Sequence, residues 1–236
     1  DARSEAWGLC GLLELALRRA EDLRLEPYDG YLRRAAGLLG GRLHRVDRIR
    51  VIGDLARAYA ARGEIDKALE YAWTGARNLD GAKPTTSYAF EGWCGVAEIL
   101  IVHNPEPAES ATSKLRGLLR EMSGSFKLTV PRTLYVDGLW RKRRGEITAA
   151  ARSFVRCEEV ARSIGLVWDE TRAAMLRLDQ DMVAAEDRPE LAARVEGLLR
   201  AMGSRKLEDF LRSEPERDAA SGSRSRRSRG SDEEAG

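Results

Sequence analysis

The stretch ARAYAARGEIDKALEYA, residues 56–72, decides how this chain folds, because a single glycine, Gly63, separates two alanine-rich runs. Apolar and small residues recur on both sides of it: Ile52, Leu55, Ala56, Tyr59 and Ala60 before the glycine, and Ile65, Ala68, Leu69, Ala72, Ala76 and Leu79 after it. Recurrence at i, i+3, i+4 and i+7 indicates an amphipathic helix. Since glycine readily adopts the left-handed conformation that ends a helix, the pattern predicts two helices folded into an antiparallel hairpin.

A second copy of this pattern lies in LYVDGLWRKRRGEITAAARSF, residues 134–154. The segments GEIDKALEY and GEITAAARSF align at their glycines, and the corresponding offsets are occupied by Gly138, Gly145, Ala150 and Phe154. The copy departs at Asp137, which takes the position of Leu55, where an apolar residue is expected. The leucine, small, aromatic, glycine and alanine positions of the first copy resemble the tetratricopeptide repeat, whose helical hairpins stack into a solenoid.

The same helical periodicity continues along most of the chain. It predicts helices at residues 3–24, 28–40, 85–103, 108–122, 167–184 and 188–202, a loop at 123–129, and a last short helix at 205–212. Pro131 falls where the first turn of a helix accepts proline. We therefore expect an all-α fold, a tetratricopeptide-like α-solenoid of stacked antiparallel helical hairpins over residues 1–212.

The composition changes at Ser213. Residues 213–236 contain no Val, Leu, Ile, Met or aromatic side chain, so they cannot offset the entropy of ordering, and we expect a disordered tail rich in Arg, Ser and acidic residues. The tail holds an arginine cluster: Arg224, Arg226, Arg227 and Arg229. Such a cluster binds RNA or acidic proteins weakly, and the open alternative is a tail that is only solvated.

Composition and charge limit the classes of function. The chain is 43% hydrophobic and 33% charged with a net charge of +2, so no overall field attracts it to nucleic acid or anionic lipid. The most apolar run, residues 93–102, has about half the length of a membrane span and contains Glu98. Three widely spaced cysteines, Cys10, Cys94 and Cys157, indicate small buried thiols in a reducing compartment. We expect a cytoplasmic protein without membrane contact.

The sequence lacks the familiar catalytic patterns. GLLGGRL at residues 37–43 has neither the lysine nor the hydroxyl residue of a phosphate-binding loop, and the GxSxG, GxGxxG and HExxH patterns are missing. The two histidines, His44 and His103, have no metal-ligand spacing to other residues, and Asp47 stands at the spacing of a surface pair with His44. We expect no catalytic residue, cofactor or metal in this segment.

The first helix of each predicted hairpin is where we expect a partner to bind. In tetratricopeptide repeats this helix lines a concave channel, and arginines there bind carboxylates of an extended peptide. The aligned positions include Gly53, Ala60 and Leu139, and the six predicted partner-binding residues are Arg50, Arg57, Arg132, Tyr135, Lys142 and Arg143. Two alternatives stay open: a face that is only solvated, and cations that stabilise the C-terminal end of the helix at WRKRRG, residues 140–145.

Four further segments occur in a recognisable order: PTTSYAFEGWCGVAEILI (84–101), PRTLYVDGLW (131–140), RGEITAAARSFVRCEEVARSIGLVWDE (144–170) and LAARVEGLLRAMGS (191–204). Together they resemble the C-terminal helical-repeat region of large bacterial signalling proteins, which join an adenylate/guanylate cyclase or regulatory domain to a STAND-type AAA-like ATPase and a tetratricopeptide arm. The matching residues are Pro84, Tyr88, Glu91, Gly92, Gly95, Ala97, Glu98, Pro131, Gly138, Gly145, Ala150, Ala161, Gly165 and Glu170.

The resemblance covers roughly residues 25–204 and consists mostly of packing positions. It departs from the expected glycine-basic ending at LRLDQDM, residues 176–182, and the tail is not part of the pattern. The nucleotide-binding and cyclase residues of such proteins belong to other domains, so the resemblance carries no catalytic residue to this chain.

Two functions follow as expectations. The first is a non-catalytic protein–protein interaction or regulatory helical-repeat module, the sensory or scaffolding arm of a signalling protein, whose partner is a protein, a peptide, or upstream ATPase or cyclase domains. The alternative is a fragment of a multidomain adenylate/guanylate cyclase or STAND-type ATPase whose catalytic domains lie upstream. The chain begins with Asp1 rather than Met, so we expect either a piece of a longer polypeptide or a processed one.

Overall fold

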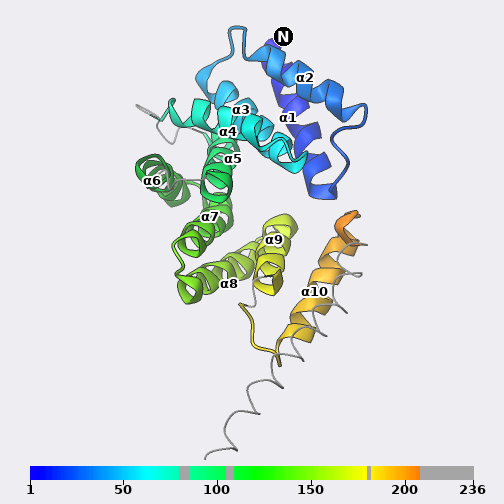
Figure 1. The fold of residues 1–236 in the computed structure, drawn as a ribbon, viewed down its shortest axis with the longest axis vertical. Coiled ribbons are helices and arrows are strands. Elements are labelled where there is room, and N and C mark those ends of the chain that lie inside the picture. Colours follow the sequence, from blue (N-terminus) through cyan, green and yellow to red (C-terminus); the bar gives the residue numbers. More distant parts are fainter. Residues whose placement is uncertain (80–85, 105–108, 180–181, 208–236) are drawn as a thin grey trace, which may run out of the picture.

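A computed structural model of the chain describes residues 1–79, 86–104, 109–179 and 182–207 (Figure 1). The described residues form ten α-helices and one short 3-10 helix and contain no strand. The helices are α1 (Ala2–Arg19), α2 (Tyr28–Leu38), α3 (Arg45–Ala61), α4 (Ile65–Ala76), α5 (Ser87–His103), α6 (Glu109–Ser125), α7 (Val130–Arg143), α8 (Ile147–Ser163), α9 (Val167–Asp179) and α10 (Arg188–Ala201), with η1 (Lys127–Thr129) before α7. The predicted all-α class is confirmed.

Both predicted hairpins are present. Gly63 has φ +80° between α3 and α4, and Gly145 has φ +76° between α7 and α8, a region that side chains other than glycine rarely adopt. The helices of each pair pack on one another, with Ala68 and Ala72 of the first pair completely buried. Two further glycines with positive φ, Gly165 and Gly203, follow α8 and α10.

The odd-numbered helices form the continuous part of the fold. Each packs on the next in the order α1, α3, α5, α7 and α9, and each also packs on the even-numbered helix that follows it. Figure 1 shows α10 lying beside α9 with its C-terminal end turned towards α1. There the backbone N–H of Arg205 donates to the carbonyl of Arg19 at 2.9 Å, and its guanidinium lies 2.8 Å from Glu21. The two ends of the described helical array therefore meet.

The tightest packing joins α3 to α5. A Cβ atom on Gly53 would lie 2.2 Å from the carbonyl oxygen of Gly92, and one on Gly95 would lie 2.5 Å from the carbonyl oxygen of Gly53. Only glycine permits this backbone contact. Around it, the main core contains Trp93, Phe90 and further buried side chains of α3 to α9. A separate cluster joins α1, α2 and α3, and a third joins α9 to α10.

Several predicted boundaries were wrong. The first helix ends at Arg19 rather than residue 24, because Ala20 takes the left-handed conformation and the following turn buries Leu23. The helix predicted at 108–122 runs on to Ser125, and most of the predicted loop is helical. The helix predicted at 167–184 ends at Asp179. Proline in the first turn of α7 is confirmed.

Two expectations fall mainly outside the described residues: the short helix at 205–212, of which only residues 205–207 are described, and the tail at 213–236. All three cysteines are buried as free thiols, as predicted. Among the described helices, none combines the length and the apolar character that crossing a membrane requires.

Candidate functional site

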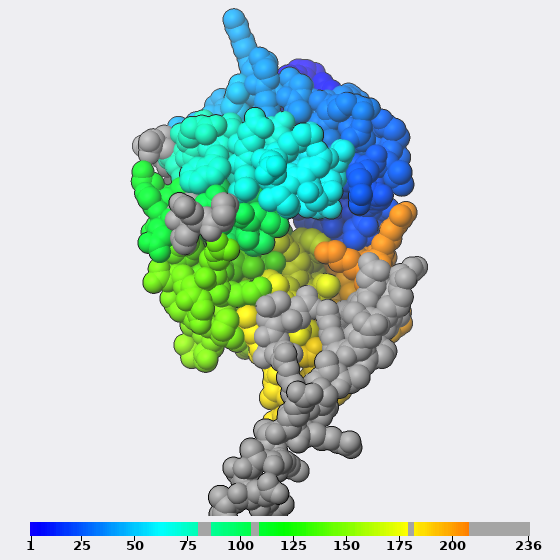
Figure 2. Space-filling model, in the orientation of Figure 1, coloured from blue at the N-terminus to red at the C-terminus, as the bar shows by residue number. Residues whose placement is uncertain are grey.

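A cleft of about 500 Å³ lies where the odd-numbered helices face one another. All five of these helices contribute to its wall, together with Lys206 beyond α10. Its lining residues are Glu14, Leu17, Arg18, Ala20, Glu21, Arg57, Ala60, Ala61, Glu98, Ile99, Val102, His103, Tyr135, Leu139, Trp168, Arg172 and Lys206. Figure 2 shows a hollow between the blue and cyan helices and the orange end of α10. Its volume is within the range of ligand-binding pockets.

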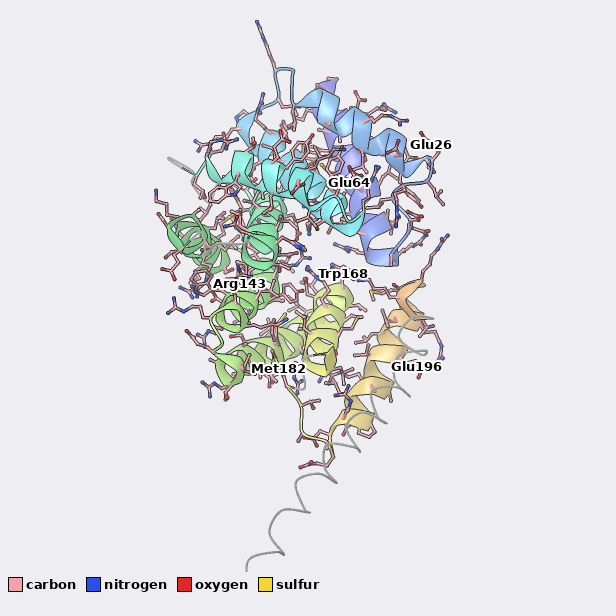
Figure 3. The ribbon with its side chains drawn as sticks, viewed as in Figure 1. Glu26, Glu64, Arg143, Trp168, Met182 and Glu196 are labelled. Carbon is pink, nitrogen blue, oxygen red and sulfur yellow. The ribbon has the colours of Figure 1, made fainter. Side chains whose placement is uncertain are left out.

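One side of the cleft is apolar. Ile99 and Leu139 are almost completely buried behind its surface, whereas Val102 keeps 47% of its surface exposed. Trp168 lies at the start of α9, on the side that faces α1 (Figure 3). The guanidinium of Arg172 lies over two rings, 4.1 Å from the centroid of Tyr135 and 5.6 Å from that of Trp168. Such contacts hold an arginine and an aromatic side chain in fixed positions.

A network of buried ion pairs forms the floor of the cleft and extends beneath it. Arg172 donates to both carboxylate oxygens of Glu98, at 2.7 and 3.1 Å. Further along the row of helices, Arg132 donates to Glu91 at 2.9 Å and also to Asp169. These contacts connect α5, α7 and α9, which are adjacent only in the folded protein.

The network continues into α1 and α3. Arg50 donates to Glu14 and lies 2.9 Å from Asp54, and Arg57 donates to Asp54 at 2.5 Å. The spacing explains this arrangement, because Arg50, Asp54 and Arg57 stand four and three residues apart on α3 and share one helix face. Glu91 lies 3.9 and 3.8 Å from the two arginines and joins both halves of the network.

The electrostatics of the network keep its carboxylates charged. Burial raises the pKa of Glu98, but Arg172, with help from Arg57 and Arg132, outweighs it and lowers the pKa from 4.5 to about 2. Burial likewise raises the pKa of Glu14, and the guanidiniums of Arg50, Arg57 and Arg18 lower it to about 2. A carboxylate with so low a pKa holds its charge at neutral pH and is a poor general acid or base.

Of the network arginines on α3, α7 and α9, Arg57 is the one that both lines the cleft and has an Nε without a hydrogen-bond partner among the described residues. Its side chain is 9% exposed and lines the cleft. One terminal nitrogen donates to Asp54, while Nε has no hydrogen-bond partner among the described residues. The Nε of Arg18, which also lines the cleft, likewise has no hydrogen-bond partner among the described residues. A buried donor without a partner is costly, so these two atoms are places where an added acceptor would stabilise the protein.

The structure separates the six residues predicted to bind a partner. Arg57 and Tyr135 line the cleft. Arg50 and Arg132 are only 5% and 2% exposed, because carboxylates of this chain surround their guanidiniums. The remaining two, Lys142 and Arg143, stand in the last turn of α7, as the helix-end alternative expects, and Arg143 donates to the carbonyl of Asn104 at 2.8 Å. Partner contact by these residues stays a prediction.

Several residues of the site escaped the sequence reasoning: Glu14, Glu98, Trp168 and Arg172 line the cleft, and Asp54, Glu91 and Asp169 complete the network beneath it. A signal was present in α5, where Glu91 and Glu98 stand seven residues apart in an otherwise apolar helix. A carboxylate amid apolar neighbours indicates a buried partner of opposite charge. Its partners come from distant helices, and the spacing along one helix does not identify them.

The two histidines have different surroundings. His103 lines the cleft, where burial lowers its pKa, and His44 caps the start of α3 by accepting from the N–H of Val46. The predicted surface pair of His44 with Asp47 is wrong, because Asp47 is buried and accepts from Trp7 Nε1 at 2.7 Å. Within the described part of the chain, no group of three His, Cys, Asp or Glu residues is placed to hold a metal ion.

Comparison of the chain with family models, with curated proteins and with solved structures finds no match. A function for this chain must therefore be inferred from the geometry of the cleft. The charged groups of the cleft are paired with one another, the Nε atoms of Arg57 and Arg18 are buried without a hydrogen-bond partner among the described residues, and one side of the cleft is apolar. This arrangement suits binding of a ligand that has both an acceptor group and an apolar part.

Proposed function

We propose that this chain is a non-catalytic interaction module whose cleft binds a peptide segment with a carboxylate beside an apolar side chain. The observation that carries the proposal is Arg57, a 9%-exposed arginine of the cleft wall whose Nε has no hydrogen-bond partner in the described part of the chain. Four cations and three carboxylates line the cleft, and Asp54 beneath it compensates Arg57. Arginine suits this role because its planar, permanently charged group matches a carboxylate.

The apolar part of the peptide would occupy the side formed by Val102, Ile99 and Leu139. Burying one leucine-sized side chain there contributes about 1.5–3 kcal/mol. Trp168 and the stacked Arg172 also line the cleft and offer the ligand an aromatic ring and a guanidinium. The charge pairs of the floor are preorganised, so they need little rearrangement when the peptide binds.

The same proposal includes a specific type of all-α fold. It is a tetratricopeptide-like array in which the first helix of each hairpin faces the ligand. Two features support it. The hairpins α3–α4 and α7–α8 turn at equivalent glycines, and the cleft is lined by odd-numbered helices. A role as the cytoplasmic regulatory arm of a bacterial cyclase or STAND-type ATPase rests on the sequence resemblance, and its peptide would then belong to a neighbouring domain of that signalling protein.

The test uses two acetylated and amidated peptides, ALDLA and ALNLA, which differ only in the charge of the central side chain. Each is titrated into the ¹⁵N-labelled protein while the indole N–H signal of Trp168 is followed, with Trp168→Phe identifying that signal. We expect ALDLA to bind with a dissociation constant below about 1 mM and at least about tenfold more tightly than ALNLA. No shift with either peptide, or equal affinity for both, refutes the proposal.

Two variants connect the effect to the cleft. Arg57→Gln should remove the preference for ALDLA, and Val102→Glu, at a position that is already 47% exposed, should weaken ALDLA more than ALNLA. The matched control is Arg152→Gln, an exposed arginine of α8 outside the cleft, which should bind both peptides as the unmodified chain does. Far-ultraviolet circular dichroism confirms that each variant is folded.

A further inference from the structure

Helix α1 repeats the sequence of α5. WGLCGLLELAL, residues 7–17, aligns without gaps on EGWCGVAEILI, residues 91–101, and identical residues stand at Gly8 and Gly92, Cys10 and Cys94, Gly11 and Gly95, and Glu14 and Glu98. Two of the four identical pairs, the cysteines and the glutamates, also have similar surroundings in the structure. Both cysteines are buried, and both glutamates form ion pairs in the network beneath the cleft.

The glycines are where the two helices differ. In α5, a Cβ atom on Gly92 would lie 2.3 Å from the carbonyl oxygen of Ile49, so this face of the helix is in backbone contact with α3. The aliphatic residues of the same stretch, Val96 and Ile99, are 0% and 5% exposed. The glycine-bearing side of α5 is therefore completely covered by its neighbours.

The corresponding side of α1 is bare. Among the described residues, and apart from the adjoining residues and backbone of α1 itself, nothing lies within 4 Å of a Cβ atom built on Gly8 or Gly11. Leu12 and Leu15, the counterparts of Val96 and Ile99, are 42% and 45% exposed. We call these four residues of α1 the α1 glycine face. Trp7 lies at its edge with 45% of its surface exposed. Contiguous exposed apolar residues of this kind mark interaction surfaces.

We infer that the α1 glycine face packs against the α1 glycine face of a second copy of this chain, about a twofold axis. The contact between α3 and α5 shows what such a crossing requires, because glycine stands on both helices where their backbones meet. The α1 glycine face meets this requirement on both sides of a symmetric pair, and its four residues carry no charge. A self-complementary patch is the basis of isologous dimers.

The exposed glycine Gly117 of α6 does not offer such a surface. Gly117 on α6 is also open, but the exposed positions three residues before and after it are Lys114 and Arg120. Two copies of that face would bring like charges together. One helix face from each chain is a small contact, so the dimer is expected to dissociate in the micromolar range.

Sedimentation velocity of the full chain from about 1 to 300 µM tests the inference. The unmodified chain should shift reversibly from monomer to dimer. Gly11→Gln should raise the dissociation constant at least about tenfold, since its side chain blocks close approach while the open site accommodates it in the monomer. The matched control is Gly117→Gln, which places the same side chain on another exposed helix glycine and should leave the dissociation constant unchanged.

A second variant, Leu12→Lys, should abolish the dimer, because the twofold axis brings the two added charges close together. An unmodified chain that stays monomeric up to 300 µM overturns the inference, and so does an equal loss of dimer in Gly11→Gln and Gly117→Gln. The inference does not rest on the peptide-binding cleft. Arg57→Gln should dimerise as the unmodified chain does, so the two proposals fail separately.

Discussion

Replacing Glu98 by Gln removes the carboxylate that holds Arg172 and leaves the rest of the side chain nearly unchanged. The Glu98 side chain is 7% exposed and accepts two hydrogen bonds from Arg172, and Arg132 lies 3.9 Å away. After the substitution, the buried guanidiniums of Arg172 and Arg132 lose part of the negative charge that neutralises them. Breaking a buried ion pair by removing one partner costs about 3–5 kcal/mol. Since the Gln carbonyl still accepts one hydrogen bond, we expect a loss of about 3 kcal/mol in the free energy of unfolding.

The pKa of Glu98 provides an independent estimate and a pH signature. Lowering the pKa from 4.5 to about 2 corresponds to about 3 kcal/mol by linkage. Because the folded-state pKa is the lower one, this contribution is complete above about pH 4.5 and is lost as the pH falls towards 2. The difference in stability between the unmodified chain and Glu98→Gln should therefore be largest at neutral pH and shrink over that interval.

Urea unfolding followed by circular dichroism measures both effects. The control is Glu159→Gln, which removes a carboxylate 2.9 Å from Arg156 in a pair whose side chains are 53% and 65% exposed. Exposed pairs contribute about 0–1 kcal/mol, so this variant should unfold almost as the unmodified chain does. A loss below about 1 kcal/mol in Glu98→Gln, or a loss equal at pH 7 and pH 3, would refute the reasoning.

Three further predictions concern packing, chain turns and thiols. Gly53→Ala should cost more than about 3 kcal/mol in urea unfolding, because its Cβ atom would lie 2.2 Å from the Gly92 carbonyl oxygen, whereas Gly11→Ala on the open face should stabilise the monomer by up to about 1 kcal/mol. Gly63→Ala should cost about 1–2 kcal/mol in the same assay, since φ is +80° there; an unchanged midpoint would contradict the conformational argument. Burial raises the pKa of Cys94, so its thiol should react with a disulfide reagent at pH 8 far more slowly in the folded chain than in urea, and equal rates would exclude a buried thiol.

Much of the local structure could be predicted from the sequence because its causes are local. Gly63 and Gly145 end helices by a backbone conformation that depends on their own residue type, and the apolar stripes on either side define helix faces. The same reasoning failed for α1, where the periodic pattern runs on to residue 24 while the helix ends at Arg19. Burial of Leu23 in a turn satisfies the pattern equally well, so periodicity alone could not place that boundary.

The departure at Asp137 also has its explanation in tertiary structure. This carboxylate replaces the apolar residue found at Leu55 and accepts hydrogen bonds from Arg116 and Arg120 of α6, at 2.7 to 3.1 Å. The second hairpin therefore packs on its neighbour partly through ion pairs. The sequence signalled the substitution but could not identify the arginines that compensate it.

The sequence by itself determined the all-α class, the two glycine-turned hairpins and the presence of arginines on the first helix of each. Only the tertiary structure decided what those arginines do. Arg50 and Arg132 pair with carboxylates 36 and 37 residues away, at Glu14 and Asp169, while Arg57 pairs with Asp54 on its own helix and lines the cleft. The physical reason is that helix formation depends on neighbours within a few residues, whereas the partner of a buried charge depends on which helices pack together.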